Sequence, residues 1–128
     1  MKLKLNTIIF YVQDPQRLKI FYRDVLGLTV VEEDDIWVLL QAGEVFVGLH
    51  KIGPAYADKM TAGHQFDSNT KIVFELDEDI QLVRKQLLEQ GVPMRELKTF
   101  DNYDYWLCDG TDPEGNVFQL KYRKQNLA

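Results

Sequence analysis

Apolar and polar residues alternate along two short stretches that lie 64 positions apart in the chain. The first stretch runs from Thr7 to Val12, and the second begins at Lys71. The matching apolar positions are Ile8, Phe10 and Val12 in the first stretch and Ile72, Phe74 and Leu76 in the second. A period of two residues is typical of a strand with one buried face. The pattern therefore predicts two equivalent strands, one in each half of the chain.

A helix with one apolar side is predicted after each strand. In the first half, Asp14 is suited to cap the helix, Pro15 to occupy its first position and Gly27 to end it. In the second half, Asp77 is the expected cap and Gly91 the expected end, again 64 residues after its counterpart. The apolar stripes are Leu18, Phe21, Tyr22 and Val25 in the first helix and Ile80, Val83 and Leu87 in the second.

Three strand-like runs follow each helix, at residues 28–33, 36–41 and 44–51 and again at 92–99, 103–109 and 116–123. The sequence therefore predicts an α+β fold of two repeated βαβββ modules. The modules cover residues 4–51 and 70–124, and a linker with several Gly, Pro, Asp and Asn residues joins them at 52–69. A length of 128 residues fits one domain that contains both modules.

The charge and cysteine content narrow the classes of partner. The net charge is -5, which argues against nucleic acid or an anionic membrane surface as a partner, since both bind clustered Lys and Arg. An acidic chain is compatible with a cationic ligand. The single cysteine, Cys108, has no disulfide partner within the chain, and the apolar run at residues 7–12 is too short for a signal peptide or a membrane span. We therefore expect a cytoplasmic protein.

Two motifs resemble those of a known superfamily. Residues 21–28 read FYRDVLGL and end the first helix, and residues 112–120 read DPEGNVFQL and form a turn followed by the last strand. Together with the repeat, they are similar to the vicinal-oxygen-chelate superfamily, which includes glyoxalases, bleomycin resistance proteins and extradiol dioxygenases. The resemblance covers nearly the whole chain. It implies that each module forms a curved mixed sheet and that two modules enclose a cavity, within one chain or across a dimer.

The resemblance also implies four positions at which enzymes of this superfamily hold a divalent metal ion. In this sequence they are occupied by Thr7, Gly48, Lys71 and Gln119. Glycine has no side chain and a lysine ammonium has no lone pair, so this set does not match the N and O donors that such ions need. We therefore expect no metal ion and no other cofactor. A shifted set of His50, Glu75 and Gln119 would be needed for a metal-dependent alternative.

Strand alternation predicts which side chains face the implied cavity. Trp37, Phe46 and Trp106 are candidates for stacking on a ligand, although the sequence does not fix the face of either tryptophan. His50, Lys71, Glu75 and Gln119 are candidates for polar contacts. Gly48 is expected to leave room in the middle, and Glu75 to pair with Lys71 or Lys121. Asp101, Asp104 and Asp109 are expected to be solvated residues at strand ends.

These observations favour metal-independent binding of an aromatic or cationic small molecule in the cavity between the modules, similar to the bleomycin-resistance branch. We expect a homodimer and predict no catalytic residue, without deciding whether the protein is an enzyme. Two alternatives stay open. One is a metal-dependent lyase or dioxygenase of the glyoxalase type with the shifted ligand set, and the other is a structural or regulatory dimer whose cavity is filled.

Overall fold

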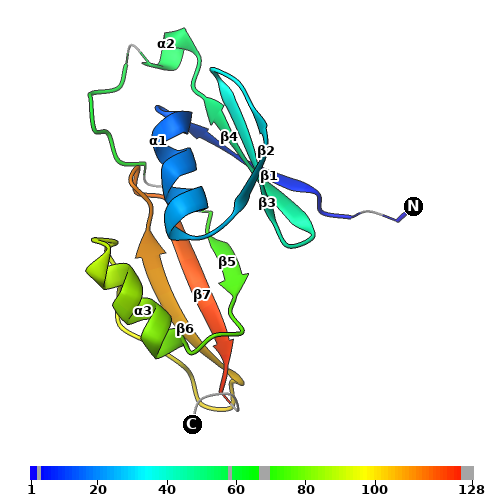
Figure 1. Cartoon of the computed structure of the whole chain (residues 1–128), viewed down its shortest axis with the longest axis vertical. Coiled ribbons are helices and arrows are strands. Elements are labelled where there is room, and N and C mark those ends of the chain that lie inside the picture. The colour runs from blue at the N-terminus through cyan, green and yellow to red at the C-terminus, as the bar shows by residue number, and fades with distance from the viewer. Residues whose placement is uncertain (3, 58, 67–69, 125–128) are drawn as a thin grey trace. The chain divides into compact units, whose positions relative to one another are not determined.

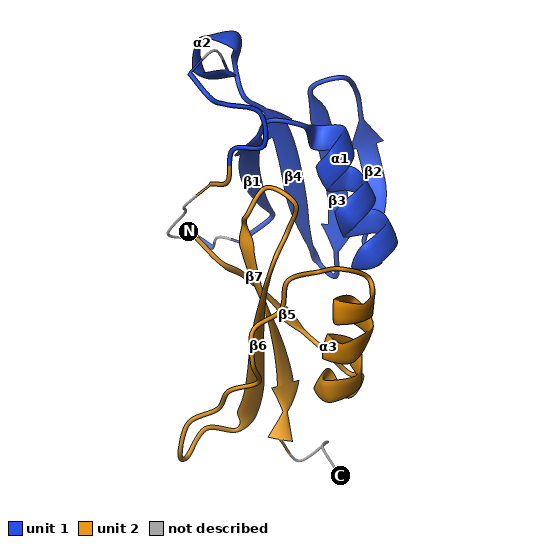
Figure 2. Cartoon of the chain, turned by 90° about the vertical axis from the view of Figure 1, so that its left-hand side faces the viewer, with its two compact units in different colours: residues 1–64 blue, residues 65–128 orange. Residues whose placement is uncertain are grey.

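The computed structural model describes residues 1–2, 4–57, 59–66 and 70–124 (Figure 1). The chain divides into two compact units, unit 1 at Met1–His64 and unit 2 at Gln65–Ala128 (Figure 2). The boundary falls within the predicted linker at 52–69, of which residues 58 and 67–69 lie outside the described part. The linker contains one short helix that the pattern does not predict, α2 (Pro54–Ala57), in which the N–H groups of Tyr56 and Ala57 bond to the carbonyl of Gly53.

Unit 1 has a four-stranded sheet in the order β1-β4-β3-β2. Its strands are β1 (Thr7–Val12), β2 (Thr29–Glu33), β3 (Trp37–Ala42) and β4 (Val45–Lys51), which confirms the predicted strands to within about a residue at each end. Strand β1 runs parallel to β4, and the other pairs are antiparallel. A parallel pair requires a crossover connection. Here the helical segment between β1 and β2 and the hairpin β2–β3 carry the chain back to β4.

The first helix is confirmed in position, and its second part is π-helical. It begins as α1 (Pro15–Ile20), which Asp14 caps by accepting a hydrogen bond from the Arg17 N–H, and it continues as the π-helical turn η1 (Phe21–Val25). The wider π turn accompanies the burial of two adjacent rings, Phe21 and Tyr22, which pack edge to face with centroids 5.1 Å apart. Gly27 then ends the segment with a φ of +80°, as predicted.

Unit 2 repeats this plan with a three-stranded sheet in the order β5-β7-β6. The strands are β5 (Ile72–Glu75), β6 (Tyr105–Thr111) and β7 (Val117–Arg123), and β5 runs parallel to β7. Helix α3 (Ile80–Glu89) packs against β6 and β7. Among the described residues, no helix combines the length and the apolar character needed to cross a membrane.

The predicted cap of α3 is wrong. Asp79, not Asp77, accepts the hydrogen bond from the Gln81 N–H, at 2.9 Å. The apolar stripe explains the difference. Ile80 is fully buried and is the first helical residue, so the side chain that reaches the free N–H groups of the first turn belongs to the residue directly before it.

The predicted strand at residues 92–99 is reduced to two isolated bridges beside β6, Met94 with Gly110 and Lys98 with Leu107. Met94 and Lys98 are four positions apart but their partners only three, so this segment contains one extra residue, as a β-bulge does. Strand β2 has the same irregularity, because the register with β3 shifts between Val30 and Glu32. The bulge is therefore part of the repeat, and it interrupts the strand more severely in unit 2.

The turn before β7 is held by one carboxylate. Oδ1 of Asp112 accepts hydrogen bonds from the backbone N–H groups of Glu114 and Asn116, each at 2.9 Å, and Oδ2 accepts one from the Asn116 side chain at 2.9 Å. Gly115 has a φ of +86°, as the predicted turn requires. These contacts give a physical reason for the Asp, Gly and Asn of the DPEGN motif.

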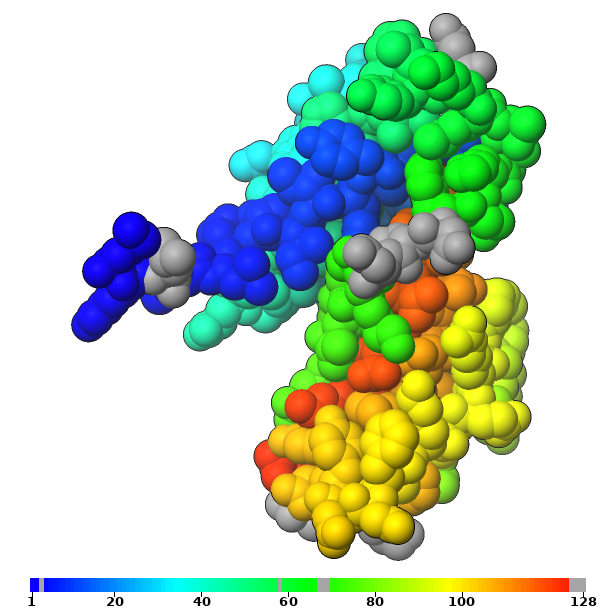
Figure 3. Space-filling model, turned by 180° about the vertical axis from the view of Figure 1, so that it is seen from behind, coloured from blue at the N-terminus to red at the C-terminus, as the bar shows by residue number. Residues whose placement is uncertain are grey.

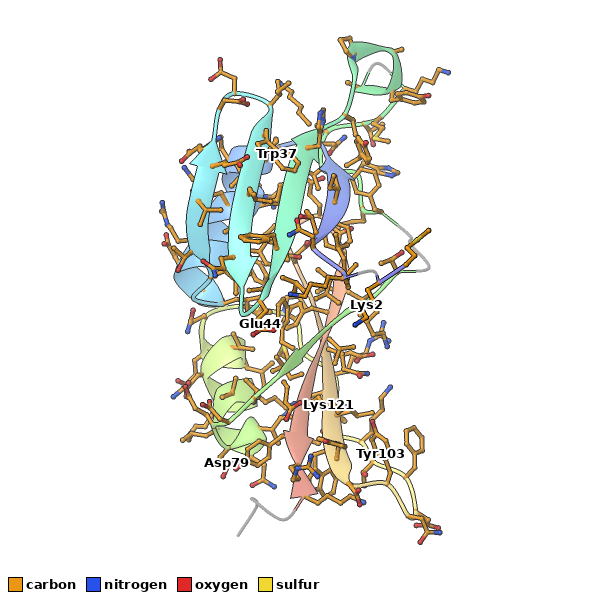
Figure 4. The ribbon with its side chains drawn as sticks, turned by 90° about the vertical axis from the view of Figure 1, so that its right-hand side faces the viewer. Lys2, Trp37, Glu44, Asp79, Tyr103 and Lys121 are labelled. Carbon is orange, nitrogen blue, oxygen red and sulfur yellow. The ribbon has the colours of Figure 1, made fainter. Side chains whose placement is uncertain are left out.

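Each sheet has one face covered by its own helix and one face without a helix, as the two-residue period predicts. The helix-covered faces include the buried residues Val12, Val38, Leu40, Val47, Leu49, Phe118, Leu120 and Tyr122. The helix-free face of unit 1 consists of Thr7, Ile9, Tyr11, Thr29, Glu32, Trp37, Leu39, Gln41, Phe46, Gly48 and His50. The helix-free face of unit 2 consists of Val73, Glu75, Tyr105, Leu107, Asp109, Thr111, Val117, Gln119, Lys121 and Arg123. Figure 4 looks onto the helix-free face of unit 1, with α1 behind the sheet.

We predict that Gly110→Ala destabilises the protein. A Cβ at this position would lie 2.6 Å from the Phe118 ring and in contact with Met94 Sδ, inside the helix-covered layer of unit 2. Overpacking of this kind costs about 1–3 kcal/mol, to be measured as the free energy of unfolding in urea. The control is Gly53→Ala, where the nearest atom is 4.0 Å away and we expect little change. Equal stability of the two variants would contradict the packing described for Gly110.

Candidate functional site

The helix-free face of unit 1 carries an aromatic cluster formed by Tyr11, Trp37 and His50. The centroids of Tyr11 and His50 are 5.3 Å apart, and those of Trp37 and His50 are 6.1 Å apart. The cross-strand register brings them together, since Tyr11 and Trp37 both pair with His50. Tyr11 is 61% exposed, so the cluster presents ring surface to solvent in unit 1.

The orientation of Trp37 is fixed by two contacts. Its Nε1–H donates a hydrogen bond to Glu32 Oε1 at 3.0 Å, and its six-membered ring lies over Gly48, where an added Cβ would be 2.8 Å from Cζ3. The expectation that Gly48 leaves open room is therefore wrong, because the indole occupies that space. Phe46 lies on the same face, two residues before Gly48 on β4, and is half-buried.

The helix-free face of unit 2 is organised around a buried carboxylate, Asp109, which is 3% exposed. Its Oδ2 pairs with Lys71 Nζ at 2.9 Å and with Lys98 Nζ at 3.8 Å. Its Oδ1 accepts a hydrogen bond from Gln119 Nε2 at 2.9 Å. The expectation that Asp109 is a solvated residue at a strand end is wrong, although Asp101 and Asp104 are exposed as expected. The reason is that β6 extends to Thr111, which places Asp109 inside the strand, opposite Gln119.

The surroundings of Asp109 favour its ionised form. Burial alone would raise the pKa of this carboxyl, but the hydrogen bonds from Lys71 and Gln119 and the charges of Lys71 and Lys98 outweigh burial and hold the pKa below its ordinary value. Asp109 is therefore a charged, neutralised residue and not a free acid or base.

The other predicted residues of unit 2 are placed differently from one another. Glu75 is exposed on β5 and forms no ion pair within the described ranges, because Lys71 pairs with Asp109 and Lys121 Nζ lies 4.0 Å from the centroid of the Tyr105 ring. The predicted pairing of Glu75 with Lys71 or Lys121 is therefore wrong. Trp106 pairs with Tyr122 and so lies on the helix-covered face, on the opposite side of the sheet from Gln119.

Of the residues on this face, Asp109 is the one whose place the sequence pattern does not predict. The signal was present, since Tyr105, Leu107 and Asp109 alternate along β6 with the same parity as Gln119 and Lys121 on β7. What the pattern lacks is the end of β6, because the predicted run stops at Asp109 whereas the strand continues to Thr111.

The four positions at which the resemblance implies a metal ion do not fit one in either unit. In unit 1, Thr7 Oγ1 donates to Asn6 Oδ1, and Gly48 has no donor and lies beneath the Trp37 ring. In unit 2, Lys71 is an ammonium paired with Asp109, and the Gln119 amide also bonds to Asp109. Within the described residues, no three His, Cys, Asp or Glu side chains are grouped so that they could hold a metal ion.

In each unit the first strand runs parallel to the last one and a helix covers one face of the sheet. This arrangement defines a protein of two βαβββ-type modules. Residues 4–120 match the model of the Glyoxalase/Bleomycin resistance protein/Dioxygenase superfamily, and the chain belongs to this superfamily. No curated protein matches the sequence.

Solved structures of low sequence identity share the fold. A lactoylglutathione lyase from Agrobacterium tumefaciens superposes with a TM-score of 0.74 at 19% identity, over 98% of this chain and 97% of that one. An antibiotic binding protein from a Streptomyces species gives 0.73 at 18% identity, over 96% and 98% of the two chains. A virulence protein from Salmonella typhimurium gives 0.72 at 19% identity, again over 96% and 98%.

We predict that Asp109 stabilises the fold in a pH-dependent way. Because its folded pKa is lowered, its contribution is complete above the ordinary Asp value of about 4 and is lost as the pH falls through the lowered pKa. The free energy of unfolding of the wild type should therefore exceed that of Asp109→Asn by the largest margin near neutral pH, and the margin should shrink below about pH 4. Asp101→Asn, at an exposed position, is the control. A margin that does not change with pH would contradict the ion pair.

We predict that Gly48→Ala displaces the Trp37 indole. The added methyl group overlaps the ring, which must move and lose its hydrogen bond to Glu32. The indole N–H resonance of Trp37 in a ¹⁵N–¹H correlation spectrum should shift, while that of Trp106, on the other unit, stays in place. An unchanged Trp37 resonance would show that the ring does not rest on Gly48.

Proposed function

We propose that this protein binds a small aromatic molecule without a metal ion. The observation that carries the proposal is the Trp37 ring on Gly48. A residue without a side chain stands where the superfamily resemblance implies a metal ligand, and an aromatic surface occupies the space instead. Stacking and edge contacts with a planar ligand are the interactions that the Tyr11, Trp37 and His50 cluster offers.

The sequence predicts an aromatic or a cationic ligand, and the charges on unit 2 favour the aromatic one. Asp109 is the buried carboxylate on the helix-free face of unit 2, and Lys71 and Lys98 already neutralise it. An incoming cation would have to compete with two lysines for this carboxylate. A neutral aromatic ligand does not need to contact Asp109, so it does not compete with Lys71 and Lys98.

The Streptomyces structure gives a precedent for ligand binding on this fold, since it is described as an antibiotic binding protein. The Agrobacterium structure is described as a lyase, so the same fold also occurs in an enzyme. Neither identity exceeds 19%, so both comparisons concern the fold and not the ligand. The proposal therefore depends on the side chains of this chain.

We expect Trp37→Leu to weaken the binding of the neutral probe 2-naphthamide about fivefold, since a lost aromatic contact costs about 1 kcal/mol. The matched control is Trp106→Leu, which removes the same side chain from the helix-covered face and should leave the dissociation constant unchanged. Binding is measured by titration calorimetry after circular dichroism has shown that both variants are folded. Equal dissociation constants for Trp37→Leu and the wild type would overturn the role given to Trp37.

The absence of a metal requirement is tested by native mass spectrometry on protein purified without chelator and then exposed to Zn²⁺, Ni²⁺ or Mn²⁺. We expect the mass of the bare polypeptide and unchanged probe binding after each metal. One divalent ion per chain, with probe binding lost on adding a chelator, would overturn the proposal and favour the metal-dependent lyase or dioxygenase. The same spectrum reports the subunit number, for which we propose two.

A further inference from the structure

The helix-free face of unit 2 is cationic although the whole chain has a net charge of -5. Lys71 and Lys98 reach this face through Asp109, and Lys121 and Arg123 belong to it by the register of β7. Asp109 and Glu75 are the acidic residues that the register places there. Four cations and two anions leave an excess of positive charge, and this excess lies where Lys121 and Arg123 project.

These two cations surround one aromatic ring. Lys121 Nζ lies 4.0 Å from the Tyr105 ring centroid, Arg123 Cζ lies 4.8 Å from it, and Arg123 Nη2 donates a hydrogen bond to Tyr105 Oη at 2.5 Å. The Tyr103 ring follows, with its centroid 5.7 Å from that of Tyr105. We name Tyr103, Tyr105, Lys121 and Arg123 the Tyr105 cluster. Figure 4 labels Lys121 and Tyr103 at this end of unit 2.

The cluster continues to an exposed ring. Phe100 is 58% exposed and its centroid lies 6.1 Å from that of Tyr103. The segment around residue 100, yellow in Figure 3, forms part of the surface of unit 2. Three rings, those of Phe100, Tyr103 and Tyr105, therefore follow one another, and the two cations lie at the Tyr105 end.

Lys121 and Arg123 have N–H groups that their contacts with Tyr105 do not use. Neither Lys121 nor Arg123 forms an ion pair with a carboxylate among the described residues, in contrast to Lys71 and Lys98 beside Asp109. A guanidinium has five N–H groups and an ammonium three, and the contacts with Tyr105 use few of them. Unpaired guanidinium and ammonium groups beside aromatic rings suit an oxyanion attached to a planar group.

We propose that the Tyr105 cluster binds the anionic group of an aromatic ligand, such as an aryl carboxylate, with Lys121 and Arg123 as its donors and the neighbouring rings against its planar part. This inference rests on the proposed function, because it takes from it the class of ligand, an aromatic molecule, and adds a charge; the site itself lies wholly on unit 2. It differs from the sequence-based expectation of a cationic ligand.

Three probes that share one ring system test the sign of the charge. They are 2-naphthoate, 2-naphthamide and 2-naphthylmethylammonium, titrated into the full chain by calorimetry. We expect 2-naphthoate to bind about tenfold more tightly than the amide, as a charge-assisted contact allows, and the ammonium to bind most weakly. The preference should fall as salt is raised from about 0.05 to 0.5 M, because the cations are not fully buried.

One pair of variants locates the contact. Lys121→Gln should weaken 2-naphthoate about three- to tenfold and leave 2-naphthamide within twofold, whereas Lys85→Gln, which removes the same charge from an exposed position on α3, should change neither. Amide resonances of residues 103–107 and 119–124 should shift with 2-naphthoate. Both substitutions keep the side chain as far as Cδ and remove only the charge and one atom of length, and the same spectra show whether each variant is folded.

The outcomes separate the two proposals. If the three probes bind equally, or if Lys121→Gln binds 2-naphthoate as the wild type does, the anionic assignment is overturned while aromatic binding stands. If none of the probes binds at millimolar concentration, both the assignment and the proposed function fail. If 2-naphthoate binds about tenfold more tightly than the amide, and Lys121→Gln but not Lys85→Gln weakens it, the assignment holds.

Discussion

Burial of one face of each sheet beneath its own helix is the constraint on which the other features depend. Leu18 and Tyr22 of the first helical segment, and Ile80 and Leu87 of α3, can be buried only against the apolar side chains that the strands present on one side. Because strand residues alternate, that requirement also decides which side chains stand on the other side. A shift of one residue in register would bury Tyr11, His50 or Gln119 and expose the core. The residues available for ligand binding are therefore fixed by the packing of residues that never contact a ligand.

The contacts of Asp109 with Lys71, Lys98 and Gln119 show how the packing of the sheet determines the chemistry of its other face. A carboxylate that is 3% exposed must be neutralised, or its burial would cost several kcal/mol. Lys71, Lys98 and the Gln119 amide meet that need, and in doing so they commit two positions at which the superfamily resemblance implies metal ligands. A cationic side chain thus stands where the superfamily resemblance implies a metal ligand. In unit 1 the implied ligand position is lost in another way: Gly48 has no side chain, and the Trp37 ring lies in the space above it.

The repeat, the strands and the helix-covered faces could be predicted because they depend on local periodicity, which the sequence displays directly. The caps and turns could be predicted where one residue type decides the matter, as with Asp14, Gly27 and Gly115, and failed at Asp77 because two neighbouring aspartates offer the same chemistry. The interruption of the strand at 92–99 could not be predicted, because a bulge depends on the pairing with β6 and not on the segment itself. The partners of Asp109 could not be predicted for the same reason, since Lys71, Lys98 and Asp109 meet only through the sheet. Periodicity assigns a residue to a face, but only the register tells which residues on that face touch.

The two helix-free faces differ in charge, and this difference bears on the kind of ligand. The face of unit 1 has aromatic, apolar and neutral polar residues with one acidic residue, Glu32, which accepts the Trp37 hydrogen bond, whereas the face of unit 2 combines aromatic rings with unpaired cations. A metal site in an enzyme of this superfamily would supply positive charge that a chelator removes. Positive charge on Lys121 and Arg123 belongs to the polypeptide, so its effect on a ligand is weakened by salt and is insensitive to a chelator. In the Tyr105 cluster, selection between ligands by charge would therefore be set by two side chains of β7 held beside a ring of β6.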